Sequence, residues 1–146
     1  MDVAEPCNVV LTTTNADFDS LAAACALASL WSRDPEFNGV PTHVVMPRGA
    51  LPVVQRFLAY HKHVLPVRGF KTIEGNDIEA LGVVDASNAQ RLGRSKRCLS
   101  LASSLHVYDH HMPSAGEQQR QQDDLELCAN GFGERAPDGT NCCGSG

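Results

Sequence analysis

Residues 8–31 have the sequence NVVLTTTNADFDSLAAACALASLW, a short apolar segment, a polar turn and a long alanine-rich segment. Residues 8–13 favour a buried β-strand, because β-branched side chains follow one another with little interruption. Residues 20–31 favour a helix, with Asp17 or Asp19 as its N-cap. A strand that leads through a turn into a helix is the first half of a β-α-β unit.

The same alternation continues along the chain as far as residue 108. Further strands are expected at residues 42–46, 64–67, 81–84 and 106–108, and Pro66 suggests an edge position for the second of these. Helices are expected at residues 51–60 and 91–103, with a short helical turn at 77–81. Strands that alternate with helices predict an α/β fold, a mainly parallel sheet flanked by helices. Trp31, Phe37 and Phe57 are expected in its core.

Length and composition indicate one folded domain followed by a tail. The chain has 146 residues, of which 42% are hydrophobic and 20% charged, enough for a core. Half of the 12 glycines lie in residues 114–146, which predicts a disordered, low-complexity tail after a domain at residues 1–113. Most of the net charge of −5 belongs to that tail. The near-neutral remainder neither requires nor excludes a nucleic-acid partner.

Targeting signals are absent from the pattern. The longest apolar stretch, residues 21–31, is too short to span a bilayer, so no membrane partner is expected. The acidic N-terminus lacks the basic region of a secretory signal. The six cysteines show neither C-x-x-C spacing nor zinc-ligand spacing to a histidine. We therefore expect an intracellular protein, cytoplasmic or organellar, that is not secreted.

Three acidic motifs follow three of the expected strands. Asp17 and Asp19 follow the first strand, Asp85 follows the strand at residues 81–84, and Asp109 follows the last strand with His110 and His111 beside it. Ligands of open parallel sheets bind outside the carboxyl ends of the strands, so these side chains are expected to converge there.

Carboxylate oxygens suit Mn²⁺ or Mg²⁺, and imidazole favours Mn²⁺ or Fe²⁺ over Mg²⁺. An aspartate such as Asp85 can bridge two ions, and a pair of ions is a common clamp for phosphoryl chemistry. Helix caps and surface turns account for most isolated motifs of this kind, so it is their combination that favours a metal site.

The combined motifs resemble a known family. The segments DFDSLAAACAL (17–27), LGVVDASNAQRLG (81–93) and VYDHH (107–111) resemble motifs I, II and III of the DHH, or DDH, phosphoesterase superfamily. With PVVQRFLAYHK (52–62), they look most like the DHH domain that precedes the CBS and nucleotidyltransferase domains of some CCA- or A-adding tRNA nucleotidyltransferases. The resemblance covers roughly residues 8–113.

The resemblance implies a Rossmann-like DHH domain within residues 1–113, the N-terminal subdomain of that family, with two Mn²⁺ or Mg²⁺ ions at the strand ends. It implies that Asp17 binds the first ion, Asp19 and His110 bind the second, and Asp85 bridges the two.

The resemblance also implies catalytic roles for Asp109, which would orient the site, and His111, which would contact the substrate phosphate. The residues after Asp85 add candidate substrate contacts. Asn88 could anchor a substrate or form the turn, and Arg91 and Arg94 could contact phosphates or belong to a solvated helix face.

Two departures from the family pattern bear on activity. Thr13 stands where the first motif usually has a histidine, and threonine is a poor ligand for Mn²⁺. The aspartate of a fourth motif is not assigned, although Asp123 and Asp124 are weak candidates.

We therefore predict a metal-dependent phosphoesterase domain that hydrolyses a phosphodiester or phosphoanhydride bond. Its partner would be a phosphorylated small molecule or a short RNA or tRNA end. The alternatives are a catalytically impaired DHH-derived module that binds RNA or scaffolds an enzyme, and a partial gene product of a tRNA nucleotidyltransferase-type protein. The sequence leaves the oligomeric state open.

Overall fold

The computed structural model describes residues 5–37, 39–47, 49–85 and 97–109. Five parallel strands form one sheet in the order β3-β2-β1-β4-β5. The strands are β1 (Cys7–Leu11), β2 (Thr42–Val45), β3 (Val67–Arg68), β4 (Ile78–Val84) and β5 (Ser104–Tyr108). The helices are α1 (Phe18–Trp31), η1 (Pro35–Phe37), α2 (Pro52–His61), η2 (Lys62–Val64), α3 (Phe70–Ile73) and α4 (Arg97–Leu101). The predicted α/β class with a parallel sheet flanked by helices is confirmed.

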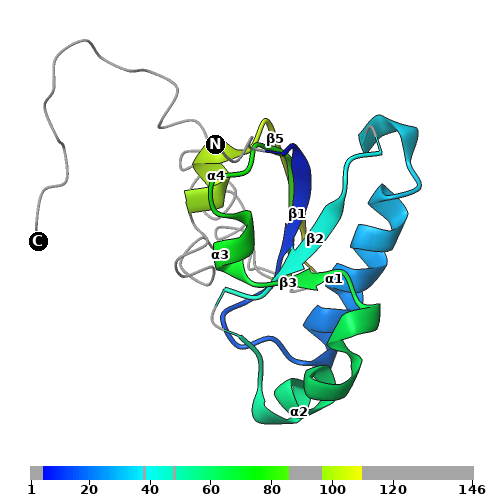
Figure 1. Ribbon diagram of the computed structural model, residues 1–146, viewed down its shortest axis with the longest axis vertical. Coiled ribbons are helices and arrows are strands. Elements are labelled where there is room, and N and C mark those ends of the chain that lie inside the picture. The colour runs from blue at the N-terminus through cyan, green and yellow to red at the C-terminus, as the bar shows by residue number, and fades with distance from the viewer. Residues whose placement is uncertain (1–4, 38, 48, 86–96, 110–146) are drawn as a thin grey trace, which may run out of the picture.

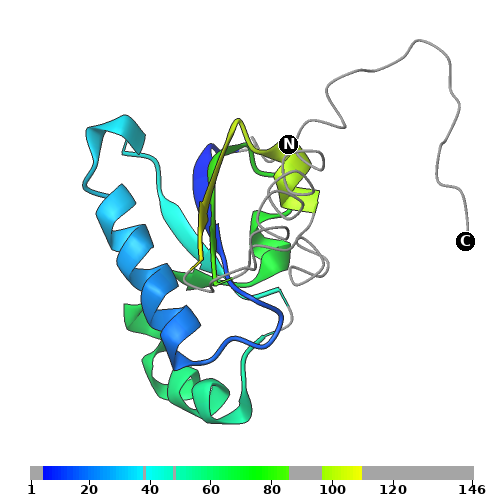
Figure 2. The same ribbon diagram turned by 180° about the vertical axis from the view of Figure 1, so that it is seen from behind.

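The helices cover both faces of the sheet. The long helix α1 and the helix α2 lie on one side, and α3 and α4 lie on the other (Figures 1 and 2). From β1 the chain moves outward to β2 and β3, then crosses back to β4 and moves outward to β5. Right-handed crossovers in opposite directions place their helices on opposite faces. The chain therefore changes direction between β1 and β4, the position where such sheets bind ligands.

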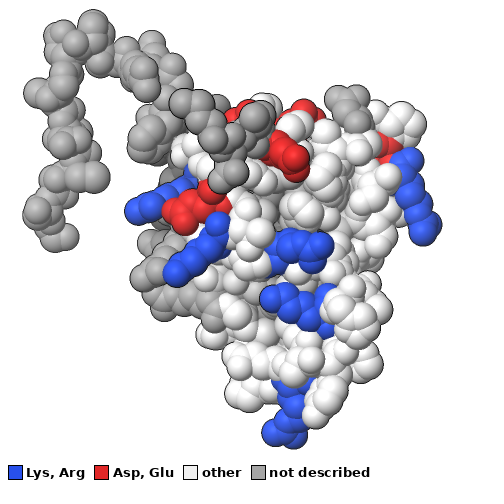
Figure 3. Space-filling model, viewed as in Figure 1, with Lys and Arg blue, Asp and Glu red and all other residues white. Residues whose placement is uncertain are grey.

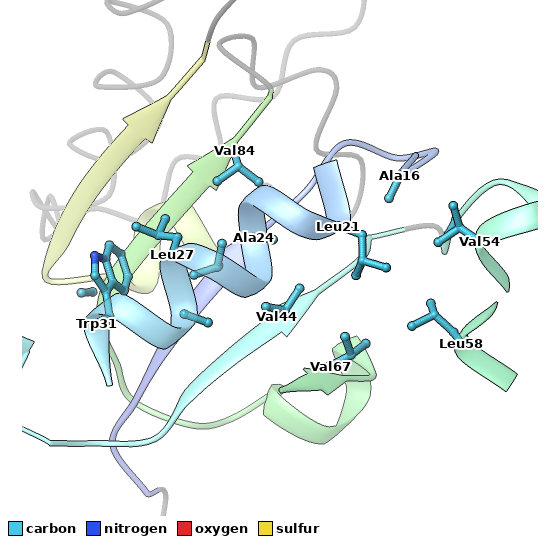
Figure 4. Close-up of a cluster of buried hydrophobic side chains, with 14 residues drawn as sticks. Ala16, Leu21, Ala24, Leu27, Trp31, Val44, Val54, Leu58, Val67 and Val84 are labelled. Carbon is cyan, nitrogen blue, oxygen red and sulfur yellow. The ribbon is translucent and has the colours of Figure 1, made fainter. Parts of the chain in front are cut away.

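Alternate residues of the strands supply two hydrophobic clusters. Val9 and Leu11 of β1 point to the cluster beneath α3 and α4, whereas Val10 points to the cluster beneath α1 and α2. Figure 4 shows the second cluster, in which Leu27 and Trp31 of α1 lie over the sheet. The helix α1 thus buries one apolar stripe against the sheet. This packing sets the position of its first turn relative to the C-terminal ends of the strands.

Gly82 of β4 lets α1 approach the sheet closely. A Cβ atom at this position would lie 2.9 Å from Cη2 of Trp31 and 3.0 Å from Cδ2 of Leu27. Real Cβ atoms do not approach their neighbours so closely in a packed core. The absence of a side chain at Gly82 is therefore what seats α1 on β4.

Several local predictions were wrong. Residues 77–81 do not form a helical turn, because β4 begins at Ile78 and pairs with β1, where the Cys7 amide donates to the Asp77 carbonyl at 2.9 Å. The strand expected at 64–67 is only Val67–Arg68, although its edge position is confirmed. Phe57 was expected in the core but is 37% exposed, because α2 turns Val54 and Leu58 inward instead.

Some predictions fall outside the described part of the chain. The described section of the helix expected at 91–103 is α4 (Arg97–Leu101). The tail at 114–146 and the N-terminal part of that helix lie outside the described residues. None of the helices that the structure describes has the length and apolar character needed to cross a bilayer.

Candidate functional site

The acidic motifs follow strands whose C-terminal ends lie at one edge of the sheet, the carboxylate edge. Val84 of β4 pairs with Tyr108 of β5, and the Asp85 amide donates to the Tyr108 carbonyl at 2.9 Å. Asp85 and Asp109 therefore follow neighbouring strands at the same level. Leu11 of β1 lies opposite Val83, so the chain leaves β1 at this edge too. The register therefore brings the ends of β1, β4 and β5 to one edge of the sheet, and the convergence of the side chains on a metal site stays a prediction.

The segment between β1 and α1 is held in place by backbone pairing. The Ala16 amide donates to the Gly49 carbonyl at 3.4 Å, and the Leu51 amide donates to the Ala16 carbonyl at 3.0 Å. These bonds tie the loop after β1 to the loop after β2. Asp17 is thereby placed directly before the first turn of α1.

Asp17 is the N-cap of α1, as one of the two sequence alternatives predicted. Its Oδ1 accepts a hydrogen bond from the Ser20 amide at 2.8 Å. The cap satisfies an amide that the helix leaves without a backbone acceptor. The same hydrogen bond is the first cause of a lowered pKa of the Asp17 carboxyl, because the amide stabilises the ionised form. Asp17 therefore combines a structural role as the cap with a carboxyl whose ionised form is stabilised at this edge.

Ser20 connects the first acidic motif with the second. It is 1% exposed, and its Oγ donates to Oδ2 of Asp85 at 2.7 Å across a separation of 65 residues. Its amide meanwhile binds Asp17, so one residue of α1 holds both carboxylates. Sequence reasoning missed this role. The available signal was a hydroxyl on the buried stripe that continues through Ala24 and Leu27.

Asp85 has a backbone conformation that few residues other than glycine adopt. Its φ angle is +57°, and no other described residue except glycine has a positive φ. Aspartate tolerates this region better than most side chains, because its short polar group can bond locally. A strained backbone of this kind costs about 1 kcal/mol or more and is found disproportionately at functional sites.

Asp19 and Asp85 line one pocket of about 640 Å³ between α1 and the ends of β4 and β5. The rest of its lining is nearly all apolar: Ala23, Ala26, Leu27, Leu30, Val84 and Tyr108. Asp19 is exposed in the first turn of α1, and Asp85 is half-buried. The pocket thus joins two carboxylates to an apolar wall, an arrangement suited to a ligand with both a charged and an apolar part.

Four carboxylates follow the strand ends, and carboxylate oxygens are the ligands that a hard divalent cation prefers. Across residues 5–37, 39–47, 49–85 and 97–109, however, no three His, Cys, Asp or Glu side chains are grouped so that they could hold a metal ion. Thr13, at the position where the predicted family would have a histidine, is 8% exposed.

The remaining predicted site residues lie outside the described part of the chain: Asn88, Arg91, Arg94, His110 and His111. The proposed metal and substrate contacts of these five side chains stay predictions.

Comparisons with known proteins give one link to function. No family model matches the chain, and no solved structure does. The chain is 27% identical over 126 residues to an A-adding tRNA nucleotidyltransferase from Geobacter sulfurreducens. The alignment covers 84% of this chain but 13% of that protein. The similarity agrees with the predicted association with tRNA nucleotidyltransferases, and the DHH assignment stays a prediction.

Proposed function

We propose that the chain carries a metal-dependent phosphoesterase domain that hydrolyses a phosphodiester or phosphoanhydride bond in a short RNA, a tRNA end or a phosphorylated small molecule. The observation that carries the proposal is the link through Ser20, which ties the carboxylate after β4 to the cap of α1 at the switch point of the sheet. A buried hydroxyl that orients a carboxylate at the end of a strand is expected where function depends on the position of that carboxylate.

In this proposal Asp17, Asp19, Asp85 and His110 are the ligands of two Mn²⁺ or Mg²⁺ ions. Such ions, when bound, supply an activated water and neutralise charge on the phosphate. Ser20 fixes the rotamer of Asp85 through its hydroxyl. The cap bond lowers the pKa of the Asp17 carboxyl and so favours the charged form, which is the form that binds a cation.

Substrate contacts complete the proposal. Asp109 orients the site, His111 contacts the phosphate, and Asn88, Arg91 and Arg94 bind the substrate further along its backbone. RNA is favoured because the similar Geobacter sulfurreducens protein is named an A-adding tRNA nucleotidyltransferase. The apolar wall of the pocket beside Asp19 and Asp85 would accommodate the uncharged part of a nucleotide.

The test is hydrolysis of a dinucleotide by the full chain with saturating Mn²⁺. We expect turnover that chelation abolishes and that Asp85→Asn lowers by at least about 100-fold, since the variant lacks the carboxylate that would hold the ions that stabilise the transition-state charge. Asn suits the positive φ and retains an oxygen for Ser20, so the fold should survive. Asp34→Asn is the matched control, because the side chain of Asp34 lies beyond the C-terminal end of α1 and accepts from the Glu36 amide at 2.9 Å. An inactive wild type, or equal rates in the two variants, would reject the proposal.

A catalytically impaired module that binds RNA or scaffolds an enzyme is the second candidate. It is favoured by Thr13, which offers no imidazole to a metal, and by the engagement of Asp17 in the helix cap. RNA binding that survives Asp17→Asn and Asp19→Asn but is lost in Arg94→Glu, in a chain without hydrolytic activity, would support it.

A further inference from the structure

One section of the chain is strongly basic although the whole is acidic. Residues 37–73 contain no Asp or Glu, and they contain the five cations Arg48, Arg56, Lys62, Arg68 and Lys71. This section supplies β2, α2, η2, β3 and α3. On the face drawn in Figure 3, the part of the molecule toward α2 carries blue side chains and no red ones, whereas the opposite end carries red side chains with blue ones beside them.

One exposed stripe of α2 is apolar and aromatic where a solvated helix would be polar. Val54 and Leu58 fill the core, yet Val53, Phe57 and Tyr60 are 56%, 37% and 73% exposed. Their spacing of four and three residues places them along one stripe of the helix. Exposed aromatic side chains that line up in this way indicate a binding surface.

A row of aromatic rings connects the candidate site with the exposed stripe of α2. Phe18, which stands between Asp17 and Asp19, packs edge-on against Phe57 with ring centroids 5.6 Å apart. Phe57 in turn packs against His61 with centroids 4.6 Å apart. Phe18 is itself 43% exposed. A continuous row of rings therefore leads from the carboxylate edge along α2.

Cations accompany this row. Arg56 precedes Phe57 and lies one turn before Tyr60, and Lys62 follows His61 directly; both cations are exposed. Rings that stack with bases, flanked by cations that contact phosphates, are the combination by which proteins hold single-stranded nucleic acid. A protein partner with an acidic, apolar surface would match the charge, but it would not need a row of separate rings.

We propose that the row Phe18–Phe57–His61, together with Tyr60, Arg56 and Lys62, binds single-stranded RNA and leads it to the carboxylate edge. This inference deepens the proposed function by giving its RNA substrate a surface beside the site. The binding itself does not depend on hydrolysis, because the surface contains none of the proposed metal ligands. In the absence of divalent cations the two proposals can therefore be tested separately.

The experiment is fluorescence anisotropy of a labelled oligoadenylate with the full chain in EDTA and low salt. We expect binding that weakens as salt is added, with a log–log slope reduced by about 0.7 in Lys62→Glu, since each lost phosphate contact removes that amount for a single strand. Tyr60→Ala should weaken binding roughly 5-fold or more, because it removes a stacking ring. Tyr60 and Lys62 are exposed, so both variants should retain the wild-type thermal unfolding curve.

Arg33→Glu is the matched control. Arg33 is an exposed cation just past the C-terminal end of α1, whereas Phe18 lies at the N-terminal end of that helix. This variant should leave the affinity nearly unchanged. Asp19→Asn should retain RNA binding in EDTA, whatever its effect on hydrolysis with Mn²⁺. The inference is overturned if the wild type does not bind, or if Lys62→Glu and Arg33→Glu weaken binding equally. It is also overturned if Tyr60→Ala abolishes self-association or binding to anionic vesicles while RNA binding is unaffected.

Discussion

Removing the hydroxyl of Ser20 should destabilise the domain without weakening the cap of α1. Ser20→Ala keeps the amide that binds Asp17 and deletes the bond of 2.7 Å from Oγ to Oδ2 of Asp85. Because the hydroxyl is buried and its acceptor is a carboxylate, the loss should be about 1.5–3 kcal/mol of unfolding free energy. Alanine improves the helix propensity by a few tenths of a kcal/mol and offsets little of this loss.

Urea unfolding of the wild type, of Ser20→Ala and of a control variant, Ser29→Ala, measures the change in unfolding free energy. Ser29→Ala is the control, because Ser29 lies on the same helix and its Oγ donates only to the Cys25 carbonyl on the exposed side. It should change the unfolding free energy by less than about 0.5 kcal/mol. A double-mutant cycle with Asp85→Gly, which suits the φ of +57°, should return a coupling of about 1.5–3 kcal/mol. Equal losses in both serine variants, or a coupling near zero, would refute the reasoning.

Three further predictions concern packing, pH and thiol chemistry. Gly82→Ala should lower the unfolding free energy by about 1–3 kcal/mol in urea, because the new Cβ would lie 2.9 Å from Trp31; an unchanged midpoint would contradict this. Asp17→Ala should cost about 1 kcal/mol at neutral pH. Because the pKa of Asp17 is lowered from 3.8 in the folded protein, its contribution is complete above that value, and the gap between variant and wild type should close as the pH falls through the lowered pKa. Burial raises the pKa of Cys98 to about 11, so peptide mapping after thiol labelling at neutral pH should find Cys98 modified only in urea.

Local pattern was sufficient for the elements with strong periodicity. The strand predicted at residues 8–13 is present as β1 (Cys7–Leu11), which ends before Thr12, and the helix predicted at 20–31 is present as α1 (Phe18–Trp31), which begins two residues earlier. The helical turn predicted at residues 77–81 was wrong because a neighbouring strand decides the structure there. Ile78 belongs to β4 because β1 lies beside it, and pairing with a neighbouring strand overrides a weak local preference.

In the candidate site, too, the sequence predicted the features that are local and missed those that depend on distant residues. The sequence indicated that Asp17, Asp85 and Asp109 follow strand ends, because strand and turn signals are local. The hydroxyl of Ser20 on the buried stripe was a signal, but the sequence did not identify Asp85 as its partner, because the bond joins residues 65 positions apart. Phe57 was misplaced for a related reason, because α2 carries two apolar stripes and periodicity does not say which one faces the sheet.

By itself, the sequence determined the general alternation of strands and helices and the acidic turns that follow three of the strands, since both arise from backbone preferences over a few residues. It missed α3 and predicted a helical turn where β4 begins. Only the tertiary structure decided the strand order β3-β2-β1-β4-β5, and with it which strand ends are neighbours. It also decided that α1 lies close enough to β4, over Gly82, for Ser20 to reach Asp85. Contacts of this kind depend on how whole elements pack together, and packing is a property of the folded core that no short stretch of sequence contains.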